Sequence, residues 1–587
     1  SQQRRPVFAP NSRVIAFVGP DNNIYMKKLD YNTEVAVTDD GAVNSVINGV
    51  PDWTYEEEFT TDCSMAFSPD SETFCFLRYD EREVPMYTLP VYEGACDPQK
   101  EYALYPGEYS YKYPVAGEPN SKVTLRSYDI DERKLADIQL PGSYEYIPRI
   151  FYTPEGKVLA VTLNRDQNRM EIYSVSPASK VAKSVFVDES KAWITPETYE
   201  DLVLCSDGFI VNSSRSGFAS LYKYSYAGAL LRTVCEEQAD VTACYGEDAA
   251  GNIYYQIAAP TPLDRTVRRM DAKGKTACIS EASGWNVPDF SSDMSYMVMN
   301  HSTATDVPVY TLCRSNGAKV RVLEDNSAYA ARVAALPKRE FFTLQSDGYT
   351  LNGYMIKPEG FNGSGKYPVV MDQYSGPGSQ SVCNRWQLDW QQYFAMQGFV
   401  VVCVDGRGTG GRGAAFRDAV YRRLGYYETI DQINAARYVA AMPGIDSSRI
   451  GICGWSFGGY EALMCATAKD APYAAACAIA PVTDWRYYDT VYAERYMLTP
   501  QQNFEGYEQS APMGRASSLA CPLMIMYGTS DDNVHPANSL EFASALQNAG
   551  MLFDMMVFPN MNHSINFCNA RAVVYANMLR FFKRELK

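Results

Sequence analysis

The fold of the C-terminal half is decided by the stretch Ile452-Cys453-Gly454-Trp455-Ser456-Phe457-Gly458, an apolar segment that turns at a serine flanked by glycines. Residues 449–452 have the pattern of a buried strand, and residues 460–468, rich in Ala, Leu and Met, have that of a helix. A serine on a sharp strand-to-helix turn needs small neighbours, which Gly454 and Gly458 supply. The G-x-S-x-G spacing therefore predicts a nucleophile elbow that exposes Ser456.

A serine hydroxyl is a weak nucleophile and needs a base, which in turn needs an orienting carboxylate. His563 follows the strand predicted over residues 553–558 and is the predicted base. Asp531 follows the strand predicted over residues 523–527 and is the predicted acid, with Asp532 as the alternative. The order Ser456, Asp531, His563 is that of α/β-hydrolases, so the three residues predict a catalytic triad on that fold.

The chain has two other histidines, and both are interpreted as structural. His535 shares a loop with Asp531 rather than facing it. His301 lies in the N-terminal half and is expected at the surface or at a strand end. His563 therefore remains the predicted base.

A second glycine-rich motif lies upstream, where Gly408-Thr409-Gly410-Gly411-Arg412-Gly413 satisfies G-x-G-x-x-G and Glu428 follows about twenty residues later. The motif is displaced from the end of the strand predicted over residues 399–405 and lies in the middle of a domain. We interpret it as a flexible loop bordering the active site rather than as a dinucleotide site. No cofactor is expected.

The length of 587 residues and a change in composition along the chain predict two domains. Residues 1–335 combine many tyrosines with short apolar runs and turns, whereas residues 336–587 alternate strands with helices. An aromatic residue, a polar turn and a strand recur in the first part, clearly from Phe8, Phe67 and Tyr152 and more weakly near Leu204, Tyr245 and Phe290. This repeat predicts a β-propeller followed by a C-terminal α/β-hydrolase domain.

The net charge of −16 and a pI near 4.9 make nucleic acid an unexpected partner and favour a cationic ligand such as a peptide amino terminus. The chain contains no run of eighteen apolar residues, so the sequence predicts no membrane span. Fifteen cysteines without a C-x-x-C pair, together with only three histidines, predict no metal site.

Five groups of residues, spread over nearly the whole chain, carry a family resemblance. They are Asp52-Trp53-Thr54-Tyr55-Glu56-Glu57-Glu58, Tyr113-Pro114 with Ala116-Gly117-Glu118-Pro119-Asn120, Gly454-Trp455-Ser456, Trp485-Arg486-Tyr487-Tyr488-Asp489 with Glu494-Arg495-Tyr496, and Asp531-Asp532-Asn533-Val534-His535. Together they resemble dipeptidyl peptidase IV of the prolyl oligopeptidase family, in a style similar to its bacterial members. This resemblance implies a serine exopeptidase that releases Xaa-Pro or Xaa-Ala dipeptides from free amino termini.

The resemblance also implies roles for residues outside the triad. Glu57 and Glu58 match the pair that binds the substrate ammonium, and two carboxylates held close together are costly unless a cation arrives. Tyr374 and the backbone N–H of Phe457 match the oxyanion hole. The proline pocket and the site for the substrate carbonyl match a larger set: Phe457, Val482, Trp485, Tyr488, Tyr492, Asn533 and Val534.

The chain departs from the family pattern at two points. Phe457 stands where the family usually has tyrosine, which removes a hydroxyl but keeps the backbone amide. By the resemblance, the chain begins about where the second or third propeller blade should be, and the segment that carries the family's substrate arginine is missing. Either the chain is a truncated form of a longer protein, which we favour and which predicts an N-terminally incomplete propeller, or this propeller closes with fewer blades. An open propeller edge would expose unpaired strand groups.

Two alternative functions remain at this stage. A prolyl tripeptidyl peptidase would use the same triad with a deeper chamber, and a catalytically inactive propeller-hydrolase would act as a binding protein. The adjacent Glu57 and Glu58 favour dipeptide release, and the intact triad disfavours an inactive protein. A lipase-like esterase is disfavoured because nothing resembles a lid of exposed apolar helix.

The resemblance further implies a homodimer and a periplasmic or otherwise extracytoplasmic location.

Overall fold

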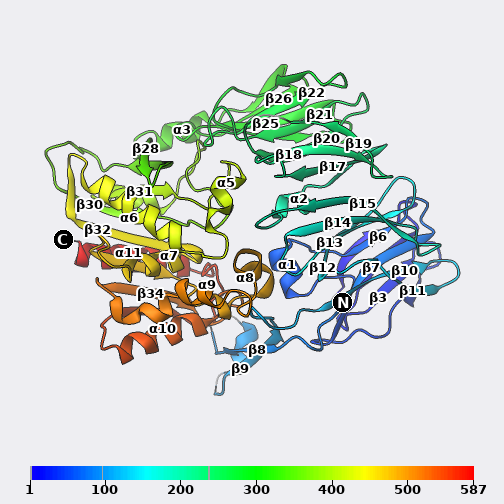
Figure 1. Cartoon of the computed structure of the whole chain (residues 1–587), viewed down its shortest axis with the longest axis horizontal. Helices are drawn as coiled ribbons and strands as arrows, with labels where there is room; N and C mark the ends of the chain where they lie inside the picture. Colours follow the sequence, from blue (N-terminus) through cyan, green and yellow to red (C-terminus); the bar gives the residue numbers. More distant parts are fainter. Residues whose placement is uncertain (1–2, 95–96, 103, 236–237, 587) are drawn as a thin grey trace. The chain divides into compact units, whose positions relative to one another are not determined.

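The computed structural model describes residues 3–94, 97–102, 104–235 and 238–586 (Figure 1). They form two compact units that are discontinuous in sequence. The first unit comprises Ser1–Thr88, Ser110–Glu236 and Asp489–Gln502. The second unit comprises Leu89–Tyr109, Glu237–Tyr488 and Asn503–Lys587.

Four antiparallel sheets make up most of the first unit. In three of them four strands pair in chain order, and in the other β7 pairs with β5, β6 and β10. The strands are β1 (Arg4–Phe8), β2 (Val14–Val18), β3 (Ile24–Lys28) and β4 (Thr33–Ala36); β5 (Val46–Asn48), β6 (Met65–Phe67), β7 (Thr73–Asp80), β10 (Lys122–Asp129) and β11 (Lys134–Ile138); β12 (Tyr146–Tyr152), β13 (Val158–Leu163), β14 (Arg169–Val175) and β15 (Ala182–Glu189); and β16 (Val203–Leu204), β17 (Gly208–Ser213), β18 (Ser220–Ser225) and β19 (Leu230–Thr233).

Two further sheets of the same kind belong to the second unit and pair in chain order. They consist of β20 (Val241–Glu247), β21 (Ile253–Ile257), β22 (Thr266–Met270) and β23 (Thr276–Cys278), and of β24 (Trp285–Phe290), β25 (Tyr296–Ser302), β26 (Val309–Arg314) and β27 (Lys319–Glu324).

Each of the six sheets contains one copy of the repeat found in the sequence. The clear copies span the turns β1–β2, β6–β7 and β12–β13, and the weaker ones lie at β16, β20 and β24. Polar residues close these turns; in one copy the backbone N–H of Ser68 donates to the carbonyl of Thr73. The predicted propeller architecture is thereby confirmed in the described residues.

An eight-stranded sheet forms the rest of the second unit in the order β28-β29-β31-β30-β32-β33-β34-β35. All pairs from β31 to β35 are parallel, whereas β28 and β29 add to the edge in antiparallel fashion. The strands are β28 (Arg339–Ser346), β29 (Tyr349–Ile356), β30 (Tyr367–Asp372), β31 (Val400–Asp405), β32 (Ile445–Trp455), β33 (Ala475–Ile479), β34 (Leu523–Gly528) and β35 (Asp554–Phe558).

Helices cover both faces of this sheet because alternate strand residues are apolar on both sides. Helices α6 (Tyr426–Ala440), α7 (Phe457–Ala466) and α10 (Pro536–Asn548) share one core with Val369, Val402 and Ile452. Helices α4 (Trp390–Met396) and α11 (Ala570–Glu585) share the other core with Val370 and Val401. The predicted α/β-hydrolase fold is therefore confirmed.

The remaining elements are short. In the first unit they are α1 (Trp53–Glu58), α2 (Pro196–Glu200) and α8 (Thr490–Met497), and in the second α3 (Ser327–Val333), α5 (Ala414–Arg417), α9 (Phe504–Gln509) and the 3-10 turns η1 (Asp97–Tyr102), η2 (Asp418–Val420), η3 (Trp485–Tyr487) and η4 (Pro512–Ser518). The pair β8 (Met86–Val91) and β9 (Gly107–Lys112) frames an excursion between β7 and β10.

The sheet type changes between Glu324 and Arg339, where the last four-stranded sheet ends and the eight-stranded sheet begins. The domain boundary predicted at residues 335 and 336 lies in this segment and stays a prediction. The two compact units divide differently, since the last two four-stranded sheets belong with the hydrolase sheet and α8 belongs with the first unit.

Candidate active site

The predicted nucleophile lies on a strained turn at the end of β32. Ser456 has φ 61° and ψ −119° and is followed at once by α7, and a non-glycine residue holds such a conformation only when its surroundings impose it. A Cβ on Gly454 would lie 2.3 Å from the carbonyl oxygen of Gly458, and one on Gly458 would lie 2.4 Å from that of Gln373. Both glycines are therefore required by close backbone approach, as the sequence predicted.

The predicted base and acid are hydrogen-bonded to each other. Nδ1 of His563 lies 2.8 Å from Oδ2 of Asp531, a distance at which the imidazole N–H donates to the carboxylate. Oδ1 of Asp531 accepts from the backbone N–H groups of Asn533 (3.1 Å) and Val534 (2.9 Å). Three donors therefore hold the two oxygens of Asp531 in one orientation, and the side chain is fully buried.

The backbone around His563 is held by neighbouring residues of the second unit. The indole Nε1–H of Trp455 donates to the carbonyl of His563 (3.0 Å), and the guanidinium of Arg571 lies 4.3 Å from the centre of the Trp455 ring. The backbone N–H of Ser530 donates to the carbonyl of Met561 (3.0 Å). Since Trp455 is adjacent to Ser456, one side chain links the nucleophile turn to the base.

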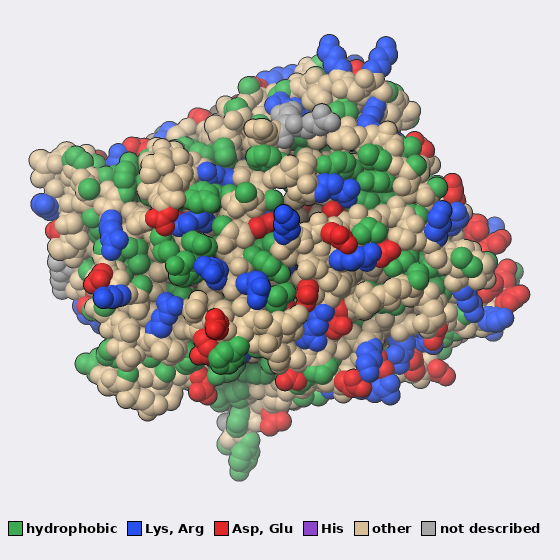
Figure 2. All heavy atoms as spheres, in the orientation of Figure 1, with side chains coloured by type: hydrophobic (Ala, Val, Ile, Leu, Met, Phe, Trp, Pro, Cys, Tyr) green, Lys and Arg blue, Asp and Glu red, His purple; other side chains and the backbone are tan. Residues whose placement is uncertain are grey.

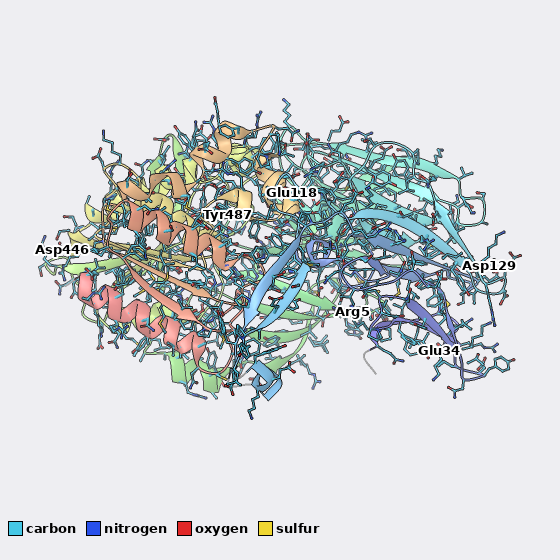
Figure 3. The ribbon with its side chains drawn as sticks, turned by 90° about the horizontal axis from the view of Figure 1, so that it is seen from below. Arg5, Glu34, Glu118, Asp129, Asp446 and Tyr487 are labelled. Carbon is cyan, nitrogen blue, oxygen red and sulfur yellow. The ribbon has the colours of Figure 1, made fainter. Side chains whose placement is uncertain are left out.

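The proposed oxyanion and pocket residues also follow the carboxyl ends of the parallel strands. Tyr374 comes two residues after β30, and its ring centre lies 6.1 Å from that of Phe457 at the start of α7. Trp485, fully buried in η3, lies 5.5 Å from Phe457 and 5.7 Å from Tyr488 between ring centres. Figure 3 labels Tyr487 of the same turn. Ligands in open α/β sheets bind at this end, so the side chains form a coherent candidate site.

Three more predicted residues add to this aromatic group in the second unit. Val482 and Val534 are buried. The hydroxyl of Tyr488 donates to Oδ1 of Asn533 (2.5 Å), which orients the side-chain amide of Asn533. Tyr492 is placed in the first unit, on α8, where its ring lies 4.9 Å from that of Tyr496.

Glu57 and Glu58 end helix α1 of the first unit, which Asp52 caps by accepting from the N–H of Tyr55 (2.9 Å). Helix α1 packs against α8. Arg495 of α8 donates to the backbone carbonyl of Glu58 (3.2 Å). This packing places Asp489, the N-cap of α8, beside Glu58.

Asp489 is fully buried, and the half-buried Glu58 lies beside it, so that the two carboxyl groups form a pair. Burial raises the pKa of Glu58 well above its usual range, and the neighbouring Asp489 raises it further. Burial likewise raises the pKa of Asp489 to about 7, against the opposing effect of the Tyr492 N–H that it accepts. The two carboxyl groups are hydrogen-bonded to each other, which raises the pKa of Glu58 and lowers that of Asp489. The pair therefore holds a proton near neutral pH, and a cation would stabilise its ionised form.

Two residues set aside in the sequence are buried in the structure. Burial lowers the pKa of His535 to about 3, so this histidine is neutral over the working range of a peptidase. Glu428 is buried within α6, where its carboxylate cannot reach a ribose. In the described residues, no group of three or more His, Cys, Asp or Glu is arranged to hold a metal ion.

Sequence reasoning assigned no role to Asp489, Trp455 or Asn560, all of which contact predicted site residues or their loops. The signal for Asp489 was present, since an aspartate directly before the helical pattern of residues 490–497 predicts an N-cap. Trp455 contacts the carbonyl of His563 and Asn560 contacts Tyr92, each over a hundred residues away in sequence, so no local pattern indicates these contacts.

Acidic and basic side chains are interspersed on the face drawn in Figure 2, without a continuous basic patch. None of the helices in the described ranges has the length and apolar composition needed to cross a bilayer.

Known families and proteins are similar to this chain over most of its length. Residues 1–308 match the model of the dipeptidyl peptidase IV N-terminal region, and residues 386–587 match that of the prolyl oligopeptidase family. A probable dipeptidyl-aminopeptidase B of Aspergillus oryzae is 32% identical over 97% of this chain and 67% of its own length. The corresponding protein of Paracoccidioides lutzii is 33% identical over 97% and 66%.

Solved structures extend the similarity to three dimensions. Dipeptidyl peptidase 4 of Porphyromonas gingivalis superposes with a TM-score of 0.97 and 41% identity, covering all of this chain and 83% of that one. A putative dipeptidyl aminopeptidase IV of Bacteroides ovatus has a TM-score of 0.88 and 24% identity over 100% and 84%, and it supports the fold.

Proposed function

Because the chain belongs to the prolyl oligopeptidase family of serine peptidases, in its dipeptidyl peptidase IV branch, we propose that it releases Xaa-Pro or Xaa-Ala dipeptides from peptides with a free amino terminus. The hydrogen bond between His563 and Asp531, at the strand ends that also present Ser456, is the observation that carries the proposal. A peptide is thus the substrate, and no cofactor takes part in the proposed reaction.

The proposed mechanism is acyl transfer through the serine. His563 accepts the proton of Ser456 as Oγ attacks the carbonyl carbon of the second residue, and it then donates that proton to the leaving amine. The N–H of Phe457 and the hydroxyl of Tyr374 stabilise the oxyanion. Water, activated by His563, hydrolyses the acyl-enzyme and frees the dipeptide. Asp531 keeps the imidazole in the tautomer that accepts at Nε2.

Substrate recognition rests on charge and on shape. Glu57 and Glu58 bind the ammonium, and the proton held by Glu58 and Asp489 leaves as the cation arrives. The rings of Trp485 and Tyr488 and the branched side chains of Val482 and Val534 suit a pyrrolidine ring or a methyl group. The Nδ2 group of Asn533 donates to a substrate carbonyl, since Tyr488 already engages its Oδ1.

Chromogenic amides test the proposal directly. Gly-Pro-p-nitroanilide should be hydrolysed, whereas its acetylated form should not, because acetylation removes the ammonium. Ser456→Ala should lower turnover at least 10³-fold with unchanged thermal unfolding. Hydrolysis of acetylated Gly-Pro amide at the same rate, or preferential cleavage of Ala-Ala-Pro-p-nitroanilide, would contradict dipeptide release from a free amine.

The proposal includes a homodimer. It rests on the family resemblance, and we assign the contact to the excursion between β8 and β9, where Leu104 and Tyr105 are 89% and 81% exposed. Light scattering at micromolar concentration should give twice the mass of 65.6 kDa. A single-chain mass for the wild type would contradict a dimer.

An extracytoplasmic location is also proposed, on the family resemblance. The cysteines of the described residues are free, and most are buried. Buried thiols are protected from oxidation, so they are compatible with an oxidising compartment. Activity released with the periplasmic fraction would support the location, and activity retained with the cytoplasm would contradict it.

A further inference from the structure

Asn560 joins the loop that carries His563 to a segment far away in sequence. Its Nδ2 group donates to the backbone carbonyl of Tyr92 (2.7 Å), and the backbone N–H of Tyr92 donates to its Oδ1 (2.9 Å). One carboxamide therefore occupies both backbone groups of one residue, as a neighbouring strand would. The pattern fixes the amide orientation, because a flipped amide would set donor against donor and acceptor against acceptor. Both residues belong to the second unit.

The same residue is tied to the loop that carries the acid. The backbone N–H of Asn560 donates to Oγ1 of Thr529 (2.8 Å), two residues before Asp531. The backbone N–H of Thr529 donates to the carbonyl of Phe558 (3.0 Å). Asn560 has φ 58°, a left-handed conformation that asparagine tolerates better than most residues. The position thus suits asparagine in both backbone and side chain.

The loop needs such support. Residues 559–569 connect β35 to α11 without helix or strand, and five of the residues after His563 are exposed: Ser564, Asn566, Phe567, Cys568 and Asn569. A general base must keep its position within about 0.5 Å, and a displacement of about 1 Å can cost 10²-fold in rate. The loop therefore depends on a few fixed points on either side of the histidine.

We infer that Asn560 is a positioning residue for His563, and that Tyr92, at the base of the β8–β9 excursion, is the anchor it uses. The inference rests on the proposed function, since it concerns the base of that reaction. The excursion then supports catalysis through the backbone N–H and carbonyl of Tyr92, whatever side chain that position carries.

The test compares two glycine substitutions on either side of His563. Asn560→Gly keeps the left-handed backbone and removes the amide, so kcat for Gly-Pro-p-nitroanilide should fall about tenfold with KM changed less than twofold. Asn566→Gly adds the same chain freedom at an exposed site and should leave both constants within twofold. Equal kinetics of the two variants would overturn the inference.

A double-mutant cycle tests the anchor itself. Tyr92→Pro removes the N–H that meets Oδ1 and should lower kcat several-fold, but combined with Asn560→Gly it should add no further loss. Full additivity would overturn the role of Tyr92. Should Asn560→Gly show no cooperative unfolding, Asn560→Asp decides: it keeps one hydrogen bond but sets a carboxylate against the Tyr92 carbonyl, and wild-type kcat in this variant would overturn the inference.

The proposed function fails separately. An inactive wild type, or activity retained in Ser456→Ala, would contradict the serine mechanism and with it this inference. An active wild type with an unaffected Asn560→Gly variant would contradict the positioning role alone.

Discussion

Asp531 and Asp489 are both fully buried carboxyl groups, yet the two units surround them differently. In the second unit, three donors meet the two oxygens of Asp531: the imidazole of His563 and the backbone N–H groups of Asn533 and Val534. In the first unit, Asp489 accepts from the N–H of Tyr492, and its other neighbour is a second carboxyl group, that of Glu58, with which it shares a hydrogen bond.

The difference indicates whether each carboxyl site needs a further ligand. A carboxylate surrounded by donors needs no further ligand and can serve as a fixed support for another group. Two carboxyl groups that repel each other in a buried site retain a proton until a cation compensates their charge. The second unit thus holds a carboxylate that its donors already compensate, whereas the first holds a carboxyl pair that the ammonium of our proposal would compensate.

The largest expected effect comes from removing the charge of the pre-formed site. Asp531→Asn keeps the acceptor for the two backbone N–H groups but can present N–H₂ to Nδ1 of His563, so the imidazole adopts the wrong tautomer. We expect kcat to fall about 10⁴-fold, as measured by hydrolysis of Gly-Pro-p-nitroanilide.

The neighbouring Asp532→Asn is the matched control and should keep kcat within a few-fold of the wild type. Thermal unfolding should be similar for all three proteins. A kcat of Asp531→Asn within tenfold of the wild type would show that the two buried carboxyl groups do not differ in role as described.

A smaller effect is expected from neutralising the amine site. Glu58→Gln should raise KM about 10- to 100-fold with little change in kcat, since hydrogen bonds to charged groups contribute about 1.5–3 kcal/mol. The exposed Glu56→Gln on the same helix is the control and should leave KM unchanged. A kcat loss in Glu58→Gln at constant KM would place this residue in the chemical step instead.

The amine site also predicts a pH dependence of KM. The pKa of Asp489 is raised to about 7, and the pKa of Glu58 is raised by burial and by Asp489. The pair therefore holds a proton below about pH 7 and releases it above. Because the ammonium prefers the ionised pair, KM should fall as the pH rises through about 7, until the substrate amine loses its proton near 8. Glu58→Gln should flatten this fall, and an unchanged profile in the variant would disconnect the pair from substrate binding.

The sequence predicted the second site better than the first for a physical reason. Ser456, Asp531 and His563 each follow a strand within a few residues, so local patterns locate them and the topology of a parallel sheet brings them together. Glu58 meets Asp489 only because α8 packs with the first unit although its sequence lies within the α/β part. Asn560 and Tyr92 are 468 positions apart, and backbone groups leave no trace in the residue type of their partner.

The smallest expected effect concerns a second pair of carboxyl groups, in the second unit: Glu461 on α7 and Glu428 on α6. Oε1 of Glu461 on α7 accepts from the hydroxyl of Thr429 (2.8 Å), and the side chain of Glu428 is fully buried, with its pKa raised by burial and by the neighbouring Glu461. Burial raises the pKa of Glu461 to about 8 and that of Glu428 well above its usual range.

This pair sharpens the comparison because no substrate compensates its charge. In the unfolded chain Glu461 ionises near its ordinary pKa of about 4.5, whereas in the folded chain it keeps its proton up to about 8. The free energy of unfolding therefore declines as the pH rises through this window. The side chain of Glu461→Gln cannot ionise. At pH 8 this variant should therefore have a free energy of unfolding about 1–3 kcal/mol above that of the wild type, and a higher unfolding temperature, with little difference at pH 4.5. Calorimetry at both pH values measures the effect, and an equal difference at the two would mean that the substitution acts through packing rather than through the proton.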